Sequence, residues 1–267
     1  MKKFAIHGLP RSGTTWIGEI VNSSPSVKYG FQPLFSYHLR GFIGECSSKE
    51  DILSFFSKLR TTRDSFICQD FIRSQGKLPQ FEKTSPTHVG YKEVRYHQVL
   101  PNILRKCDDI KLVLIERNPL AVISSWLEAP REFRSDLGWV ANEEWRYALK
   151  KNLNRPEEYN GYERWKEATY LFRILASSYE DQVSIVRYED LLKYPVQTVQ
   201  KMFKFLELPY TEQTNKFLSK IEADEDPYSV NRSKNIDSKW ESSLDQEIID
   251  AVYRDLEGSI LADLLPF

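Results

Sequence analysis

A glycine-containing segment near the N-terminus has the residues and the spacing of an anion-binding loop. Residues 8–15 read GLPRSGTT and follow a short apolar run at 4–7. Apolar side chains then recur at helical spacing through residues 16–21. The pattern predicts a turn between a strand and a helix. Consecutive backbone N–H groups and a helix N-terminus converge in such a turn, and together they bind a phosphate or a sulfate group.

One position of this loop limits the ligand that it can bind. The segment fits the nucleotide-triphosphatase pattern GxxxxGK[ST] except at the lysine, where Thr14 stands. In those enzymes the lysine reaches the β- and γ-phosphates of ATP. Here the cation of the loop is Arg11, three residues earlier. The loop therefore favours one phosphate with a short anionic group beyond it over a triphosphate.

Two further apolar runs end in polar residues that could reach the same ligand. Residues 111–115 precede the sequence ERNP at 116–119, and residues 183–186 precede the sequence RYED at 187–190. Ligands of parallel α/β sheets bind beyond the carboxyl ends of the strands. We therefore expect the polar residues after these two runs to lie near the anion-binding loop.

Amphipathic helices are predicted between and after these strands. Apolar side chains recur at helical spacing over residues 48–59, 162–180, 195–207 and 243–256. Buried apolar strands that alternate with such helices are typical of a parallel sheet covered on both faces. We predict an α/β fold with a central parallel sheet flanked by helices. No linker-like stretch divides the chain, so residues 1–267 are expected to form a single domain.

The overall composition gives the chain almost no net charge. The 37 basic and 38 acidic side chains give a net charge of −1, so we expect no nucleic-acid partner. The three cysteines form no CxxC pair, and we expect a reduced compartment and no metal site. We also expect a soluble, cytoplasmic protein, because no secretory signal and no apolar stretch of membrane-spanning length is present.

Four segments, in order along the chain, resemble those of sulfotransferases that use 3′-phosphoadenylyl sulfate (PAPS). Residues 10–16, PRSGTTW, resemble the loop of that family that binds the 5′-phosphosulfate. Residues 116–125 look like its 3′-phosphate motif, in which an arginine is followed eight residues later by a serine. Residues 188–191, YEDL, are similar to a third family segment, and residues 232–240 more loosely resemble its C-terminal cofactor loop.

The resemblance implies a P-loop nucleotide-kinase-like sulfotransferase fold and a PAPS cosubstrate. A sulfuryl group would pass in line to an acceptor hydroxyl, without a metal, and adenosine 3′,5′-bisphosphate would be released. Arg11 would act in catalysis by stabilising charge on the oxygen that bridges phosphorus and sulfur. The cosubstrate would be bound by Arg11, Ser12, Gly13, Thr14, Thr15, Trp16, Arg117, Ser125, Tyr188 and Lys234.

The general base is not given by the resemblance. Cytosolic sulfotransferases have a histidine two residues after a lysine, and alignment of that lysine with Lys92 places Val94 at the histidine position. Golgi carbohydrate sulfotransferases have a glutamate before a proline, where this chain has Gln32. Residues 92–96 resemble the KxxRL strand of the carbohydrate enzymes, which would put Lys92 and Arg95 near the sulfate. The remaining candidate bases are Glu93, His97 and His38.

The acceptor and two alternative functions stay open at this stage. The acceptor would be a small molecule or a carbohydrate, with a glycolipid as one candidate. Trp126, Trp139 and Trp145 could form a platform for a sugar, although packing between helices is the better prediction for them. A nucleotide kinase would instead require ATP and Mg²⁺, and a non-catalytic nucleotide-binding module would bind the bisphosphate without turnover.

Overall fold

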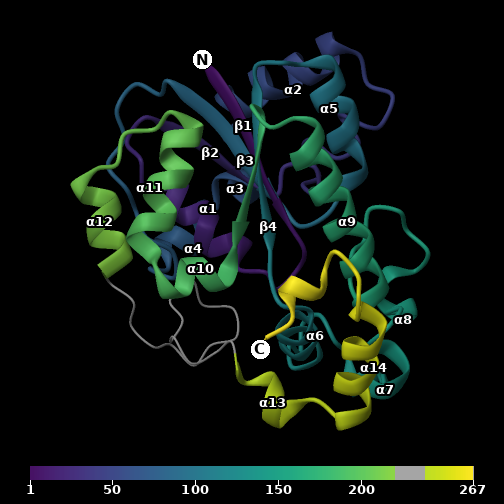
Figure 1. Cartoon of the computed structure of the whole chain (residues 1–267). Helices are drawn as coiled ribbons and strands as arrows, with labels where there is room; N and C mark the ends of the chain where they lie inside the picture. The colour runs from purple at the N-terminus through teal and green to yellow at the C-terminus, as the bar shows by residue number, and fades with distance from the viewer. Residues whose placement is uncertain (220–237, 267) are drawn as a thin grey trace.

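The computed structural model describes residues 1–219 and 238–266, and a parallel β-sheet lies at its centre (Figure 1). The sheet has five strands in the order β2-β3-β1-β4-β5, and every neighbouring pair is parallel. Its strands are β1 Lys2–Gly8, β2 Val27–Phe31, β3 His88–Glu93, β4 Ile110–Glu116 and β5 Val183–Arg187. The predicted α/β fold with a central parallel sheet is confirmed.

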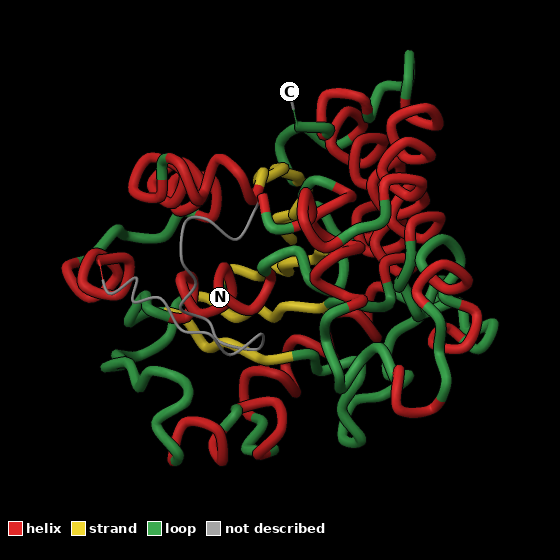
Figure 2. The backbone as a smooth tube through the Cα atoms, turned by 90° about the horizontal axis from the view of Figure 1, so that it is seen from below, coloured by secondary structure: helices red, strands yellow, loops and turns green. Residues whose placement is uncertain are grey.

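Helices cover both faces of this sheet. Figure 1 shows α1, α11 and α12 on one side and α2, α5 and α9 on the other, and Figure 2 shows the strands between groups of helices. The helices are α1 Thr14–Asn22, α2 Lys49–Thr61, α3 Ser65–Cys68, α4 Asp70–Ser74, α5 Leu100–Lys106, α6 Pro119–Leu127, α7 Ala141–Glu144, α8 Leu149–Asn152, α9 Tyr162–Ser178, α10 Tyr188–Lys193, α11 Pro195–Leu206, α12 Glu212–Ser219, α13 Trp240–Ser243 and α14 Gln246–Leu256. Short 3₁₀ turns lie at η1 His97–Val99, η2 Ser135–Leu137 and η4 Ala262–Leu264. The helices predicted from periodicity correspond to α2, α9, α11 and α14.

The alternation of side chains along β1 explains the two apolar layers. Phe4 and Ile6 pack in the layer that contains Ile17 of α1 and Phe203 of α11. Ala5, between them in the sequence, packs in the opposite layer with α2, α5 and α9. Both faces of the strand are thus buried at residues 4–6, which is why these three residues are all apolar rather than alternating with polar ones.

Two strands, β2 and β3, were not predicted from apolar runs. Their sequences, VKYGF and HVGYKE, contain lysine, glycine and glutamate, so neither reads as a continuous apolar segment. Residues 92–96 were expected to form a strand, but β3 ends at Glu93. The chain turns beyond it because Tyr96 has a left-handed backbone conformation, with φ of 59°.

The sheet brings three helix N-termini to one edge. Helices α1, α6 and α10 begin within a few residues of the carboxyl ends of β1, β4 and β5, and these three strands are neighbours. All three predicted polar segments therefore meet at the same edge of the sheet. Among the helices of residues 1–219 and 238–266, none is long and apolar enough to cross a bilayer.

Candidate active site at the carboxyl edge of the sheet

The turn between β1 and α1 leaves a helix N-terminus open. The N–H of Ser12 donates to the carbonyl of Leu9 over 3.2 Å, which closes the turn. Gly13 is the N-cap residue of α1, with φ of 78°, and as a glycine it supplies no side-chain cap to the helix. The first N–H groups of an uncapped helix have no partner within the helix, so they can bind an anion.

Gly13 is also the point at which Tyr188 packs against the loop. A Cβ atom at Gly13 would lie 2.3 Å from Cε2 of Tyr188, closer than any van der Waals contact allows. The ring of Tyr188 meets that of Trp16 edge to face, with 6.2 Å between their centroids. The structure thus brings Trp16 and Tyr188, two of the predicted nucleotide ligands, together beside the loop.

The side chains of the loop fit a phosphate-sized ligand. The hydroxyl of Ser12 is buried and has no hydrogen-bond partner in the described part of the chain. A buried hydroxyl without a partner is uncommon, and a bound anion would supply one. Thr14 is 4% exposed, whereas Thr15 is half-buried at the start of α1. The residues present therefore fit the 5′-phosphate that the loop was predicted to bind.

Arg117 connects the loop to the third motif. Its side chain is buried, one terminal nitrogen donates to the carbonyl of Arg11 over 2.6 Å, and its guanidinium lies 4.4 Å from the centroid of the Tyr188 ring. The carbonyl of Arg117 accepts a hydrogen bond from the indole N–H of Trp165 over 3.0 Å. Arg117 thus holds the backbone of the loop in addition to its predicted place near a 3′-phosphate.

The ends of β4 and β5 are tied together by residues to which sequence reasoning gave no role. Asn118 caps α6, since its side-chain oxygen accepts from the N–H of Leu120 over 2.9 Å. The N–H of Asn118 donates to the carboxylate of Glu189 over 2.7 Å, and Glu116 pairs with Arg173 through contacts of 2.8 and 2.9 Å. The ERNP and YED segments therefore anchor each other at this edge of the sheet.

Arg11 lies between the loop and α6. It has a left-handed backbone conformation, with φ of 69°. Its Nε donates to the hydroxyl of Ser125 over 3.1 Å, so two of the predicted cosubstrate ligands are in direct contact. A terminal nitrogen of Arg11 lies 3.3 Å from the carboxylate of Glu132. Sequence reasoning missed Glu132, because it follows α6 in an irregular segment that carries no motif.

Aromatic side chains and a lysine flank the ends of β2 and β3. The Lys92 ammonium is buried and lies 4.1 Å from the ring centroid of Phe31. Phe66 contacts Phe31 and Phe35, with centroid separations of 5.7 and 6.2 Å. The guanidinium of Arg95 covers Phe35 at 4.2 Å. We call Phe31, Phe35 and Phe66 the aromatic wall; Phe35 and Phe66 are partly exposed to solvent.

The predicted base Glu93 is fully buried at the end of β3. One of its carboxylate oxygens accepts from the N–H of Leu34 over 2.8 Å, and the other has no partner in the described part of the chain. Burial raises the pKa of Glu93 and lowers that of the adjacent Lys92. Because side chains alternate along a strand, Glu93 and Lys92 extend toward opposite faces of the sheet.

Of the other predicted site residues, His97 is in the core, His38 is on the surface and Lys234 is outside the described residues. His97 is buried, its Nδ1 lies 3.0 Å from Nδ1 of His7, and its ring packs on those of Tyr159 and Phe172. Burial lowers the pKa of His97 well below its ordinary value. His38 is exposed in the segment between β2 and α2. Lys234 lies outside the described residues.

The three tryptophans considered for a sugar platform pack within the protein. Trp126 and Trp139 both meet Phe133 edge to face, at centroid separations of 5.4 and 5.8 Å. Trp145 lies 5.7 Å from the ring of Tyr162. Trp145, at the end of α7, packs on α9 as predicted, whereas Trp126 and Trp139 pack on Phe133 of the irregular segment between α6 and α7 rather than between two helices.

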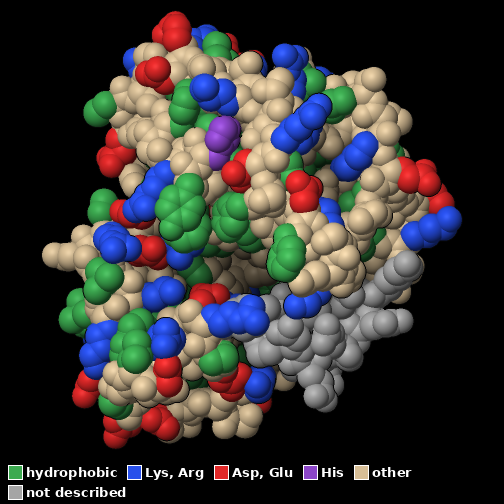
Figure 3. All heavy atoms as spheres, turned by 180° about the vertical axis from the view of Figure 1, so that it is seen from behind, with side chains coloured by type: hydrophobic (Ala, Val, Ile, Leu, Met, Phe, Trp, Pro, Cys, Tyr) green, Lys and Arg blue, Asp and Glu red, His purple; other side chains and the backbone are tan. Residues whose placement is uncertain are grey.

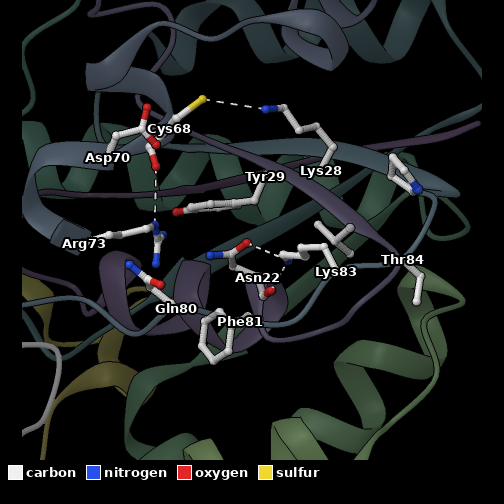
Figure 4. Close-up of a pocket in the computed structure, with 12 residues that line it drawn as sticks. Asn22, Lys28, Tyr29, Cys68, Asp70, Arg73, Gln80, Phe81, Lys83 and Thr84 are labelled. Carbon is white, nitrogen blue, oxygen red and sulfur yellow. Dashed lines mark hydrogen bonds between the residues drawn. The ribbon is translucent and has the colours of Figure 1, made fainter. Parts of the chain in front are cut away.

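A pocket of about 650 Å³ lies at the other end of α1, near Asn22 (Figure 4). Two cations that line it already have partners. Arg73 pairs with the buried Glu19 through contacts of 2.6 and 2.9 Å, and Lys83 donates to the side chain of Asn22 over 2.9 Å. These contacts tie the segment between α2 and β3 to α1. None of the residues that line this pocket is among the predicted site residues.

Comparison with known proteins decides the family. The family model described as "Sulfotransferase domain" matches residues 1–257. The chain belongs to the sulfotransferase family. It is a PAPS-dependent sulfotransferase, as the resemblance of its motifs predicted. No curated protein matches the chain significantly.

Solved sulfotransferases share its fold at low sequence identity. Mouse sulfotransferase SULT7A1, complexed with PAP, is 12% identical with a TM-score of 0.52, and the match covers 98% of this chain and 87% of that one. A sulfotransferase from Alicyclobacillus acidocaldarius is 17% identical with a TM-score of 0.53, with coverage of 100% and 97%. A retinol dehydratase, in complex with androsterone and inactive cofactor PAP, is 14% identical with a TM-score of 0.55, with coverage of 97% and 82%.

Proposed function

We propose that this sulfotransferase transfers the sulfuryl group to a hydroxyl of a small molecule that carries an apolar ring. The observation behind the proposal is the aromatic wall, because its Phe31 lies directly against the buried ammonium of Lys92. Lys92 is expected near the sulfate, so an acceptor that is sulfated there would have to pack against Phe31. A flat apolar ring gains both buried area and ring contacts in such a place.

The acceptor had been expected to include carbohydrates or glycolipids as candidates. The tryptophans that could have supported a sugar are occupied in packing, so they no longer favour that class. A related fold supports the apolar class, since the retinol dehydratase structure contains the steroid androsterone. On the face seen in Figure 3, hydrophobic and basic side chains border a hollow, which suits an apolar molecule that reacts next to an anion.

The cosubstrate is proposed to bind across the three motifs. Bound PAPS would supply an activated sulfuryl group on a 5′-phosphate. The N–H groups that begin α1 and the side chains of Ser12, Thr14 and Thr15 hold that phosphate, and Gly13 allows Tyr188 to approach. Arg117 and Ser125 bind the 3′-phosphate, while Trp16 and Tyr188 enclose the nucleotide.

Arg11 is proposed to stabilise charge at the leaving oxygen. It belongs to the loop that holds the 5′-phosphate, and its guanidinium is held by Ser125 on one side and Glu132 on the other. A cation fixed in this way needs no reorganisation when negative charge develops on the bridging oxygen. Its contribution is therefore expected in the transition state more than in binding.

The acceptor class is tested by steady-state kinetics with PAPS and two acceptors, 2-naphthol and N-acetylglucosamine. We expect turnover of 2-naphthol and none of the sugar. Phe31→Leu should raise the KM for 2-naphthol about 10-fold, the effect of losing roughly 1.4 kcal/mol of ring contact. The matched control is Phe205→Leu, because Phe205 of α11 packs in the same way under Lys111, with 5.1 Å from ring centroid to ammonium.

Two results would overturn this proposal. Turnover of the sugar without turnover of naphthol would exclude an apolar acceptor. An equal rise in KM for Phe31→Leu and Phe205→Leu would show that the aromatic wall does not bind the acceptor.

A further inference from the structure

The carboxylate of Glu132 lies beside the anion-binding loop. Its carboxylate is 3.3 Å from a terminal nitrogen of Arg11, which is the cation assigned to the leaving oxygen. Its side chain is 26% exposed, so it is neither sealed in the core nor fully solvated. In an in-line transfer the acceptor oxygen approaches sulfur from the side opposite the leaving oxygen, a few ångströms away from it.

The charge of Glu132 also acts on a second cation of the site, Lys92. Burial lowers the pKa of Lys92, and the neighbouring carboxylates of Glu93 and Glu132 oppose that shift by their charge. Glu132 is thus close enough to Lys92 for its charge to act there. Glu132 thus contacts the cation assigned to the leaving group, and its charge acts on the lysine that lies against Phe31 of the aromatic wall.

The three bases expected from the sequence have no such contacts. Glu93 uses one oxygen to hold the backbone of Leu34, and its side chain extends to the face of the sheet opposite Lys92. His97 lies in an aromatic cluster with zero exposure. His38 is on the surface. Of these four residues, Glu132 is the one whose carboxylate contacts Arg11.

We infer that Glu132 is the general base of the transfer, an inference that rests on the proposed sulfation of a hydroxyl. Glu132 takes the proton of the acceptor hydroxyl as the acceptor oxygen bonds to sulfur. The bond from sulfur to the bridging oxygen breaks, and its electron pair leaves with the 5′-phosphate of the bisphosphate, where Arg11 stabilises the charge. The proton then passes from Glu132 to water, so the products are a sulfate ester, adenosine 3′,5′-bisphosphate and one proton.

The test compares Glu132→Gln with Glu128→Gln. Glu128, at the C-terminus of α6, pairs with Lys239 on the surface, so its variant makes the same change of charge four residues away. For Glu132→Gln we expect kcat for 2-naphthol to fall about 10²- to 10⁴-fold, the usual range for a general base. The decline of kcat at acid pH in the wild-type enzyme should be absent from Glu132→Gln. Glu128→Gln should retain the wild-type rate and pH profile.

A more acidic acceptor gives the sharpest readout. At mildly alkaline pH 4-nitrophenol is largely ionised and needs no base, so Glu132→Gln should transfer to it there at a rate close to that of the wild type. Glu132→Asp, which keeps a carboxylate, should retain the acid decline of kcat for 2-naphthol at a reduced rate. Calorimetry should give a dissociation constant for the bisphosphate within about threefold of the wild-type value.

Other outcomes would refute the inference. Full activity of Glu132→Gln with tighter binding of the bisphosphate would mean that Glu132 is only a counter-ion of Arg11. Loss of the acid decline in Glu93→Gln rather than in Glu132→Gln would identify Glu93 as the base. Absence of naphthol turnover by the wild-type enzyme would refute the proposed acceptor class instead. In that case calorimetry still tests Glu132, because tighter binding of the bisphosphate by Glu132→Gln would show that Glu132 is only a counter-ion of Arg11.

Discussion

Replacement of Arg117 by methionine should weaken the two nucleotides unequally. The change keeps a long apolar side chain over Tyr188 and removes two kinds of interaction. One is the 2.6 Å hydrogen bond to the carbonyl of Arg11, which organises the loop for any 5′-phosphate. The other is the proposed pairing with the 3′-phosphate, which adenosine 5′-phosphosulfate does not have.

The expected size follows from these two losses. A hydrogen bond with a charged donor is worth about 1.5–3 kcal/mol, or roughly 10- to 150-fold in affinity. Loss of the bond to the loop should weaken both nucleotides by about 10-fold or more. Loss of the 3′-phosphate contact should weaken adenosine 3′,5′-bisphosphate by a further factor of about 10 to 150.

Titration calorimetry with both nucleotides measures the difference, and general effects on folding cancel in the ratio of the two affinities. Arg173→Met is the matched control, because Arg173 pairs with the buried Glu116 just before Arg117 and bonds to no predicted nucleotide ligand. Its variant should lower the melting temperature and leave the ratio of affinities unchanged. Equal losses for the two nucleotides on Arg117→Met would refute the assignment of the 3′-phosphate to Arg117.

Three further predictions concern the loop and the core. Arg11→Ala should lower kcat by about 10²- to 10³-fold with a much smaller change in bisphosphate affinity, and Arg11→Lys should recover much of the rate. A large loss of affinity with kcat preserved would show that Arg11 instead anchors the cosubstrate in the ground state. Gly13→Ala should lower the bisphosphate affinity and the stability more than Gly76→Ala does. Both glycines have a positive φ, but of the two only Gly13 lies against another side chain. Comparable losses for the two variants in calorimetry and in melting curves would contradict this. Burial lowers the pKa of His7 from 6.5 to about 3, so its neutral form stabilises the fold above pH 6.5 and that stabilisation is lost as the pH falls toward 3. In urea unfolding, the free energy of unfolding should fall by up to about 1.4 kcal/mol per pH unit for this residue, and the slope against pH should be shallower for His7→Asn. Equal slopes for the wild type and His7→Asn would contradict this prediction.

The parts of the fold that the sequence predicts are those in which one physical signal dominates. Strand β4 is buried on both faces, so its residues form a continuous apolar run that is easy to recognise. Strand β2 is at the edge of the sheet and carries Lys28, whose ammonium bonds to the carbonyl of Thr62 over 3.2 Å. That partner is far away in the sequence, so periodicity alone could not identify the strand.

The candidate site shows the same contrast between residues that a local sequence pattern reveals and residues placed by contacts far apart in the sequence. The loop was found because its backbone geometry requires Gly13 and leaves a local pattern in the sequence. Glu132 was missed because its place beside Arg11 depends on how the chain returns after α6, and no local pattern records that path. Motifs thus located the cosubstrate site, whereas the acceptor side required tertiary contacts.

The most direct test of the account is a single-turnover experiment with ³⁵S-labelled PAPS and 2-naphthol, in the presence of a chelator so that no divalent metal contributes. We predict that labelled naphthyl sulfate and adenosine 3′,5′-bisphosphate appear together in equal amounts, and that Arg11→Ala slows both to the same extent. Release of the bisphosphate with free labelled sulfate and no sulfated naphthol would contradict the account.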